Sequence, residues 1–249
     1  MTAQLSFDFT GTRALVTGAT SGIGHAVAVL LRDAGAEVTV TGTKPAAADY
    51  DTDLAGMAYR QLVLTEPASI DSLAASIAEL DVLVNNAGAN FPGGLDESAP
   101  DGFAASVALN LTGPYRLTVG LRRALKASTA AGGASVVNLA SMSALRAVTV
   151  VPGYGAAKSG IINITRNLAV KWAKYGIRVN AVAPGTIETA MTAPMHAVPE
   201  IVASEIAHIP AGRMGTVDEV APAIAFLCTA QSSYINGAVL VVDGASDCV

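Results

Sequence analysis

The segment Tyr154-Gly-Ala-Ala-Lys158 carries two side chains that could exchange a proton with a substrate. Their spacing of four places both on one face if the segment is helical. A free tyrosine has a pKa of roughly 10 and exchanges protons poorly at neutral pH. A nearby ammonium group favours the phenolate and lowers that pKa. The spacing therefore indicates a tuned acid/base pair, although such pairs also occur as an exposed lysine beside a half-buried tyrosine.

A glycine-rich turn stands near the start of the chain, where two elements must meet. The apolar run Arg13-Ala-Leu-Val-Thr17 predicts a buried strand, and the stretch from Ile23 to Ala34 predicts a helix. Gly18, Gly22 and Gly24 lie at the junction. Glycines allow a sharp turn and a close approach of the backbone to a pyrophosphate, and the helix N-terminus offers free N–H groups. The turn therefore predicts a dinucleotide site, the alternative being a glycine-rich turn without a ligand.

The remaining elements follow the same alternation of strands and helices. Strands separated by helices indicate parallel βαβ units, and almost wholly apolar strands indicate a sheet that is covered on both faces. Helices are expected over Ile70 to Glu79 and Lys158 to Tyr175, and the chain has no linker-like break. We therefore expect one α/β domain over 1–249 with a doubly wound parallel sheet. Its seven predicted strands are Arg13–Thr17, Glu37–Thr41, Tyr59–Leu64, Asp81–Asn85, Ser135–Leu139, Arg178–Val182 and Val239–Val242.

Composition excludes several classes of protein. The chain has 249 residues, 51% of them hydrophobic, and a net charge of −5 without a basic run, which argues against nucleic-acid binding. The two cysteines, Cys228 and Cys248, form no metal-binding pattern and are expected to be reduced thiols. The N-terminus lacks the features of a signal peptide, and no apolar run spans a bilayer. We expect a cytoplasmic protein without a metal.

Five sequence features, taken together, resemble the short-chain dehydrogenase/reductase family in its compact form. The chain is similar to bacterial 3-ketoacyl-carrier-protein reductases and to sugar and alcohol dehydrogenases. The resemblance covers nearly the whole chain and implies a Rossmann-type fold. The matching segments are TGxxxGIG at 17–24, NNAG at 85–88, the tetrad Asn110, Ser141, Tyr154 and Lys158, PG at 184–185 followed by Thr189, and a C-terminal segment 213–244 that ends in VDG.

The resemblance implies an oxidoreductase that interconverts a ketone and a secondary alcohol. Tyr154 would be the general acid in reduction and the base in oxidation, which is typically worth ~10²–10⁴ in rate. Ser141 would hold the reacting oxygen, and Lys158 would lower the pKa of Tyr154 and bind the ribose hydroxyls. Asn110 precedes a Gly-Pro pair that predicts a helix kink, and the kink would free backbone groups for a proton relay. Alone, Ser141 could be a strand-end cap and Asn110 a structural residue.

The resemblance also implies which residues hold the dinucleotide. The Asn residues of NNAG are expected to brace neighbouring strands, and Ile187 and Thr189 are expected near the nicotinamide or the phosphates. The cofactor-binding set is Gly18, Thr20, Ser21, Gly22, Ile23, Gly24, Thr43, Lys44, Leu64, Asn86, Ala87, Gly88, Tyr154, Lys158, Pro184, Gly185, Ile187 and Thr189.

The end of the second predicted strand favours NADP(H) over NAD(H). Proteins that prefer NAD place a carboxylate there, which repels a 2′-phosphate, but this chain has Gly42, followed by Thr43 and Lys44. Two departures weaken the assignment. Ser21 stands where many NADP(H) members have a basic residue, and Val63 stands where the family usually has an aspartate, so that adenine contacts would depend on the backbone and Leu64.

The segment 189–210 is the expected substrate lid. Its methionines suit an adaptable apolar pocket, and Arg146 is the nearest candidate for an anion contact. We therefore expect a neutral or weakly polar ketone or alcohol as substrate, and the family implies a homotetramer. Two alternatives stay open: a nucleotide-sensing protein that has lost catalysis, and a lyase or epimerase that uses the cofactor transiently.

Overall fold

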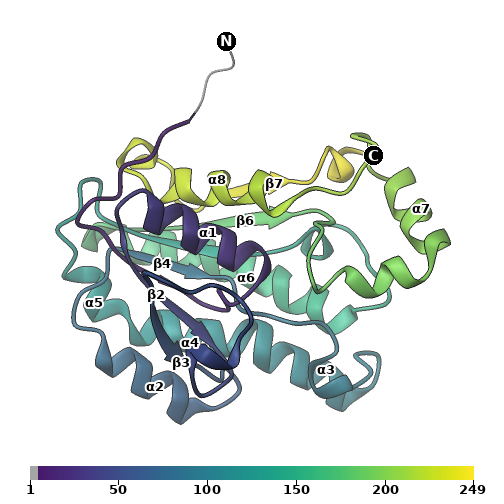
Figure 1. Ribbon diagram of the computed structural model, residues 1–249, viewed down its shortest axis with the longest axis horizontal. Helices are drawn as coiled ribbons and strands as arrows, with labels where there is room; N and C mark the ends of the chain where they lie inside the picture. Colours follow the sequence, from purple (N-terminus) through teal and green to yellow (C-terminus); the bar gives the residue numbers. More distant parts are fainter. Residues whose placement is uncertain (1–4) are drawn as a thin grey trace.

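The computed structural model describes residues 5–249, and residues 1–4 of the expected domain lie outside the described residues (Figure 1). Its strands form one parallel sheet in the order β3-β2-β1-β4-β5-β6-β7, which confirms the predicted fold class. The strands are β1 (Arg13–Val16), β2 (Glu37–Gly42), β3 (Ala58–Gln61), β4 (Val82–Asn85), β5 (Ala134–Leu139), β6 (Ile177–Pro184) and β7 (Val239–Val242).

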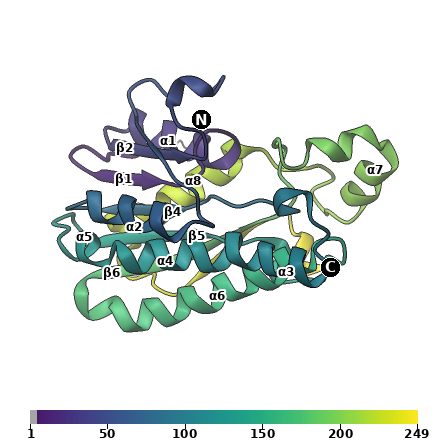
Figure 2. The ribbon, with the colours of Figure 1, turned by 90° about the horizontal axis from the view of Figure 1, so that it is seen from below.

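Helices cover both faces of the sheet. The α-helices are α1 (Gly22–Asp33), α2 (Pro67–Ser76), α3 (Pro100–Val107), α4 (Gly113–Gly120), α5 (Arg122–Lys126), α6 (Pro152–Trp172), α7 (Pro199–Ala207) and α8 (Val217–Cys228). Helices α1 and α8 lie on one face, and α2, α4, α5 and α6 lie on the other (Figure 2). Among the described helices, none is both long and apolar enough to cross a membrane.

The hydrophobic core is divided between the two faces of the sheet, because successive side chains of a strand point to opposite faces. On β1, Ala14 and Val16 pack with α1 and α8, whereas Leu15 packs with the helices of the opposite face. Strands β4, β5 and β6 are buried along their whole length. The expectation of almost wholly apolar strands is wrong for β3, where Arg60 and Gln61 are exposed, because β3 lies at the edge of the sheet.

Two predicted boundaries are wrong for local reasons. The third strand ends at Gln61 and not at Leu64, because the N–H of Val63 donates to the Ser69 hydroxyl (2.9 Å) and the strand ladder stops. Helix α2 runs over Pro67–Ser76 and not to Glu79, since Ile77 is already extended. The connection from β2 to β3 contains a single 3₁₀ turn, Ala47–Asp49, as its helical element.

The kink expected at Gly113-Pro114 appears as a wide helical turn just before it. Between α3 and α4, residues Ala108–Thr112 form a π-helical turn, and the Gly113 N–H bonds to the carbonyl of Ala108. Pro114 has no N–H, so the carbonyl of Asn110, four residues earlier, receives no α-helical hydrogen bond. The backbone carbonyl of Asn110 is therefore without its usual α-helical donor.

The strand order reverses direction at β1, which pairs with β2 on one side and with β4 on the other. The connections that follow β1 and β4 leave the carboxyl ends of these strands in opposite directions. Open α/β sheets bind ligands in the crevice that results. The glycine turn follows β1 and the NNAG segment follows β4. The fold thus places two of the predicted motifs on the two sides of the crevice.

Candidate active site

Hydrogen bonds join the glycine turn to the NNAG segment. The Thr17 hydroxyl accepts the N–H groups of Asn86 and Ala87, both at 3.0 Å. The Asn86 amide donates to the carbonyls of Thr17 (2.9 Å) and Gly18 (3.0 Å). A Cβ on Gly24 would collide with that amide. The two segments are therefore braced against each other, as the sequence predicted for the asparagines of NNAG.

Backbone conformation explains why the turn needs glycine. Gly18 has φ +63°, and a Cβ there would lie 2.8 Å from the Cα of Ala87. Two features exclude such a Cβ: the left-handed backbone conformation of Gly18 and the close approach of the Ala87 backbone. Ser21 is the N-cap residue of α1, and its side chain makes no capping hydrogen bond. The free N–H groups of this helix N-terminus suit a phosphate.

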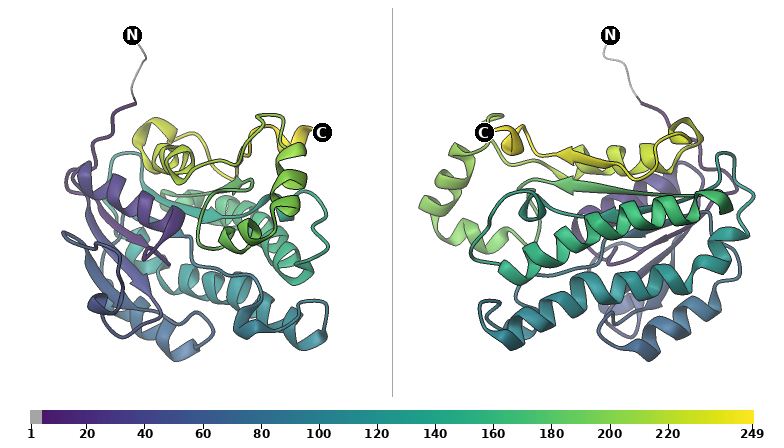
Figure 3. Two further views of the ribbon diagram at one scale, coloured as in Figure 1. Left: turned by 45° about the vertical axis from the view of Figure 1, so that its right-hand side comes forward. Right: turned by 180° about the vertical axis from the view of Figure 1, so that it is seen from behind.

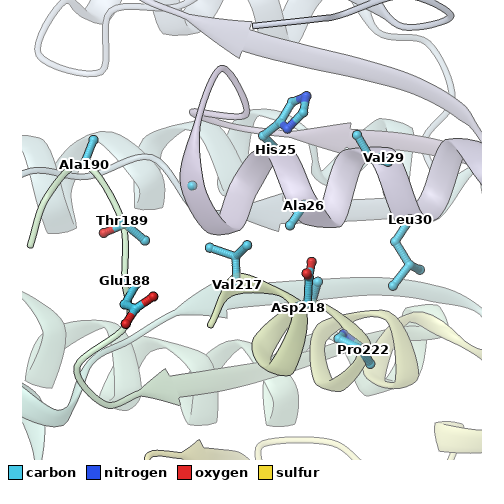
Figure 4. Close-up of a pocket in the computed structure, with 12 residues that line it drawn as sticks. His25, Ala26, Val29, Leu30, Glu188, Thr189, Ala190, Val217, Asp218 and Pro222 are labelled. Atoms are coloured by element: carbon cyan, nitrogen blue, oxygen red, sulfur yellow. The ribbon is translucent and has the colours of Figure 1, made fainter. Parts of the chain in front are cut away.

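A groove of about 630 Å³ continues from this turn between α1, the segment after β6 and α8 (Figure 4). Thr189 faces Gly22 across it, and a Cβ on Gly22 would lie 3.5 Å from the Thr189 methyl carbon. Ile187 is buried and forms a bridge with Gly215, which fixes the chain after β6. The structure therefore brings the end of β6 next to the glycine turn, as a shared dinucleotide site requires.

The side chain of Tyr50 lies against the end of β2. The N–H of Lys44 donates to the Tyr50 hydroxyl (2.7 Å), and its ammonium group donates to the Asp49 carbonyl (2.5 Å) while lying 4.8 Å from the centre of the Tyr50 ring. A Cβ on Gly42 would collide with the Tyr50 hydroxyl. Thr43 and Lys44 are exposed. This arrangement leaves two exposed polar side chains beside the end of β2, of which Lys44 is a cation. It leaves no room for a carboxylate on residue 42.

Ser141 follows β5 and is held by its neighbour. Its oxygen accepts the N–H (3.2 Å) and the hydroxyl (3.0 Å) of Ser143, and it caps the 3₁₀ turn Met142–Ala144. The strand-end cap is therefore real. With both lone pairs of Ser141 engaged, its own O–H is left to donate. Capping and donation to a reacting oxygen are thus compatible.

Tyr154 and Lys158 lie one turn apart in the first half of α6, as the spacing predicted. The Lys158 ammonium group is buried, donates to the carbonyl oxygen of Leu139 (2.6 Å) and lies 5.3 Å from the centre of the Tyr154 ring. Burial lowers the pKa of Lys158 to about 8. Since Leu139 ends β5 two residues before Ser141, this bond also ties α6 to the strand that carries Ser141.

The predicted downward tuning of Tyr154 by Lys158 is wrong for this structure. The pKa of Tyr154 is raised to about 12, chiefly because burial disfavours the phenolate; the Ser141 hydroxyl lowers it and the negative charge of Glu97 raises it further. The Lys158 charge is directed to Leu139 instead. Tyr154 is therefore a neutral phenol at neutral pH, which is the protonation state that a proton donor needs.

Asn110 is fully buried at the centre of the π turn. Its amide donates to the carbonyls of Ala89 (2.9 Å) and Ser106 (3.0 Å), and its oxygen accepts the Ala89 N–H (3.1 Å). A Cβ on Gly88 would lie 2.6 Å from the Asn110 oxygen and 3.6 Å from the Lys158 nitrogen. Asn110 therefore braces the NNAG segment and borders Lys158.

Sequence reasoning missed two acidic residues near these groups. Glu97 is completely buried and accepts the N–H of Tyr154 (2.6 Å). Glu205, on α7 of the expected lid, binds Arg146 (3.1 Å) and the Thr186 hydroxyl (2.5 Å). No motif marks either residue: Glu97 follows Asp96 in the loop before α3, and Glu205 stands among the mainly apolar residues of α7.

The predicted cofactor residues come together along one edge of the sheet. Gly18 to Gly24 follow β1, Thr43 and Lys44 follow β2, and Asn86 to Gly88 follow β4. Pro184 ends β6, with Gly185, Ile187 and Thr189 behind it. Leu64 follows β3 and is buried, and its carbonyl lies against Gly113 at the start of α4. No group of three or more potential metal ligands occurs among the residues that the structure describes.

Known proteins resemble this chain over almost its whole length. The model of a family described as enoyl-(acyl carrier protein) reductase matches residues 18–245. The 3-oxoacyl-[acyl-carrier-protein] reductase FabG of Salmonella typhimurium is 37% identical over 242 residues, which cover 95% of this chain and 97% of the relative. The cis-4-hydroxycyclohexanecarboxylate dehydrogenase of Sinomonas cyclohexanicum is 39% identical over 240 residues, covering 93% and 94% of the two chains.

A solved structure gives the same result. The gluconate 5-dehydrogenase of Burkholderia cenocepacia, in complex with NADP and tartrate, superposes with a TM-score of 0.84 at 29% identity. The superposition covers 98% of both chains.

Proposed function

The chain belongs to the short-chain dehydrogenase/reductase family, and we propose that Tyr154 is the residue through which it exchanges a proton with a ketone or a secondary alcohol. The position of Tyr154 one helix turn before Lys158, whose ammonium group bonds to the strand that leads to Ser141, is the observation that supports this role most strongly. Family membership makes the chain an NAD(P)(H)-dependent oxidoreductase. The protein would work as one domain over 1–249 with a lid at 189–210.

The residues of the crevice fit a dinucleotide. The left-handed Gly18, the close approach of Gly24 to Asn86 and the open N-terminus of α1 form a cradle that any Cβ would fill. When bound, the nicotinamide supplies the hydride for reduction and accepts it in oxidation. Pro184, Gly185, Ile187 and Thr189 would hold the nicotinamide side of the cofactor, and Lys158 would bind its ribose.

Each residue of the tetrad has a separate part in this proposal. Ser141 donates a hydrogen bond to the substrate oxygen, which holds that oxygen as negative charge develops on it. Tyr154 gives its phenolic proton to the same oxygen. Lys158 stabilises the phenolate that forms. Asn110 keeps the π turn open beside Lys158, so that its backbone carbonyl can accept a hydrogen bond from a water molecule, and that water would pass protons between Lys158 and solvent.

NADP(H) is the cofactor that we favour over NAD(H). Thr43, exposed at the end of β2, and Lys44 can both donate to a 2′-phosphate, and position 42 cannot hold a carboxylate that would repel it. The gluconate dehydrogenase structure contains NADP. Ser21 offers no charge, so Lys44 would be the principal cation of this subsite.

A small ketone or secondary alcohol, neutral or weakly polar near the reacting carbon, suits the substrate side best. Arg146, the cation considered for an acid group, is already paired with Glu205. The named relatives act on a carrier-bound 3-oxoacyl group, a hydroxycyclohexanecarboxylate and gluconate. Free ketones, cyclic keto acids, sugar acids and 3-oxoacyl thioesters therefore form the panel to be tested.

A homotetramer is the assembly that we propose, in the cytoplasm as the sequence predicted. Helices α4 and α6 lie side by side on the outer surface (Figure 3), and Tyr115 and Val119 on α4 and Val170 on α6 are exposed apolar residues. Val170 is 83% exposed, and with Tyr115 and Val119 it gives these two helices apolar surface that another subunit would cover.

Absorbance of NADPH in the presence of the panel tests the proposed function. Oxidation of NADPH that depends on a ketone supports a reductase, and the same assay with NADH ranks the two cofactors. Binding of either cofactor without turnover of any ketone or alcohol would favour the sensor. Isomerisation of substrate without net change of NADPH would favour a lyase or epimerase.

A further inference from the structure

Glu97 is the one carboxylate among the described residues whose side chain is fully hidden, with 0% exposure. It lies between the 3₁₀ turn Pro92–Gly94 and α3. Glutamates are almost never fully buried unless they are paired, because a charge loses its hydration there. Among the ion pairs of the described residues, none includes Glu97. Its negative charge must therefore be held by other groups.

Two backbone N–H groups hold the carboxylate. One oxygen accepts the N–H of Phe91 (2.9 Å), and the other accepts the N–H of Tyr154 (2.6 Å). Tyr154 is the third residue of α6, where N–H groups have no partner within the helix and the helix dipole attracts negative charge. A charge-assisted hydrogen bond is shorter and stronger than a neutral one. Glu97 thus ties the backbone of Tyr154 to a loop 63 residues earlier (154 minus 91).

The chain is adapted to this contact on both sides. A Cβ on Gly153 would lie 3.1 Å from the Glu97 oxygen and 2.9 Å from the Ser106 Cβ, so glycine allows the close approach. Phe91 has φ +48°, a left-handed conformation that is strained for a residue with a Cβ. Non-glycine residues persist in this region when the surrounding structure holds them, commonly at functional sites. The hydrogen bond to Glu97 holds Phe91 there.

We propose that Glu97 is a positioning residue for the reaction of Tyr154. It fixes the start of α6 against the loop that carries Phe91, and its buried charge opposes ionisation of the Tyr154 hydroxyl. The inference rests on the proposed function, because it concerns the proton that Tyr154 transfers.

The electrostatics agree with this role. Burial is the main cause of the raised pKa of Tyr154, and the negative charge of Glu97 adds to it. On α6 itself, Lys158 is the charged group nearest the Tyr154 ring, at 5.3 Å. The other carboxylates of the loop and of α3, Asp96 and Asp101, are exposed, where water screens them.

The turn after β5 also packs against α6, and the charged side chain that follows this turn is Arg146. It is paired with Glu205 on α7, which offsets its charge. Glu97 is therefore the negative charge that acts on Tyr154 without a compensating cation of its own.

The pH dependence of alcohol oxidation in Glu97→Gln tests this role. Oxidation needs the phenolate, so its rate rises with pH through the pKa of Tyr154. Removing the charge should move that rise to lower pH by about one unit. Asp96→Asn, which removes one exposed charge from the neighbouring residue, is the matched control and should leave the profile unchanged. A folded Glu97→Gln protein with the wild-type profile would overturn the proposal.

Glu97→Asp separates charge from position and covers the case in which Glu97→Gln does not fold. Aspartate keeps the charge but cannot reach both N–H groups. We expect the wild-type pH profile with kcat lowered by about tenfold, and cofactor affinity close to the wild type. Wild-type kcat in Glu97→Asp would also overturn the proposal. Failure of the proposed function would look different, because the wild type itself would then turn over no alcohol or ketone.

Discussion

The ammonium group of Lys158 donates a 2.6 Å hydrogen bond to the carbonyl oxygen of Leu139, the last residue of β5. This bond holds a buried cation between the strand that leads to Ser141 and the helix that carries Tyr154. A buried ammonium group with a lowered pKa is destabilising for the fold. Lys158 is therefore a residue at which stability and the proposed activity are expected to conflict.

The pH dependence of stability checks this conflict. The pKa of Lys158 falls from 10.5 in the unfolded chain to about 8 in the fold, so the penalty is full below pH 8 and is lost as pH rises towards 10.5. The free energy of unfolding of the wild type should therefore rise, relative to Lys158→Met, by about 2 kcal/mol between pH 7 and pH 9.5. Urea unfolding at both pH values measures this difference.

Lys171→Met is the matched control for that experiment, because Lys171 is exposed on the same helix. Its difference from the wild type should be the same at both pH values. If the difference in the free energy of unfolding between Lys158→Met and the wild type is also the same at both pH values, the ammonium group is not destabilised by burial.

Cofactor preference should respond differently at two adjacent positions. Thr43→Asp places a carboxylate at the exposed end of β2 and should shift kcat/KM from NADPH towards NADH by about tenfold or more. Gly42→Asp should instead lower Tm and weaken binding of both cofactors, since its Cβ meets Tyr50 and Thr20. Unchanged selectivity in Thr43→Asp would refute the proposed 2′-phosphate subsite.

Most of the fold and of the site could be predicted from the sequence, because their signals are local. The glycine turn, NNAG and the tetrad have fixed spacing, and parallel strands bring them to one edge. Tyr50 could not be predicted in the same way. It reaches Gly42 through a loop whose path is set by packing.

The charge state of Tyr154 could not be predicted either. Spacing placed Lys158 beside it, but the carbonyl of Leu139 lies nearer and takes the ammonium hydrogen bond. The burial that raises the pKa of Tyr154 and the approach of Glu97 are both properties of the tertiary structure. A sequence pattern shows which residues are neighbours on one helix, but it does not show how far their charged groups are removed from water.

The expected lid is held by one acidic side chain. Glu205 on α7 binds Arg146 and Thr186, and Glu205→Gln should weaken this contact. The pair is partly exposed, so stability should change by less than about 1 kcal/mol. KM for the ketone should rise several-fold while cofactor affinity stays the same.

Glu200→Gln removes an exposed charge from the first turn of the same helix and is the control. Steady-state kinetics with both variants measures the effect. If KM does not change in Glu205→Gln, the contact has no part in substrate binding.

The exposed face of α6 should be an interface. Val170→Asp puts a charge where another subunit is expected to pack and should convert the tetramer to smaller species. Leu5→Asp changes an exposed apolar residue far from α6 in sequence and should leave the assembly intact. Light scattering of the three proteins measures their masses. If Val170→Asp still forms a tetramer, this face of α6 is not part of the interface between subunits.

Turnover of Tyr154→Phe is the most direct test of the account. The variant lacks only the phenolic oxygen, so it should still bind NADPH in a fluorescence titration, with affinity lowered by no more than the loss of one hydrogen bond, about tenfold. Its rate of ketone-dependent NADPH oxidation should fall by about 10²–10⁴-fold, the usual contribution of a positioned acid. A Tyr154→Phe protein that reduces the ketone at the wild-type rate would contradict the role of Tyr154 as proton donor.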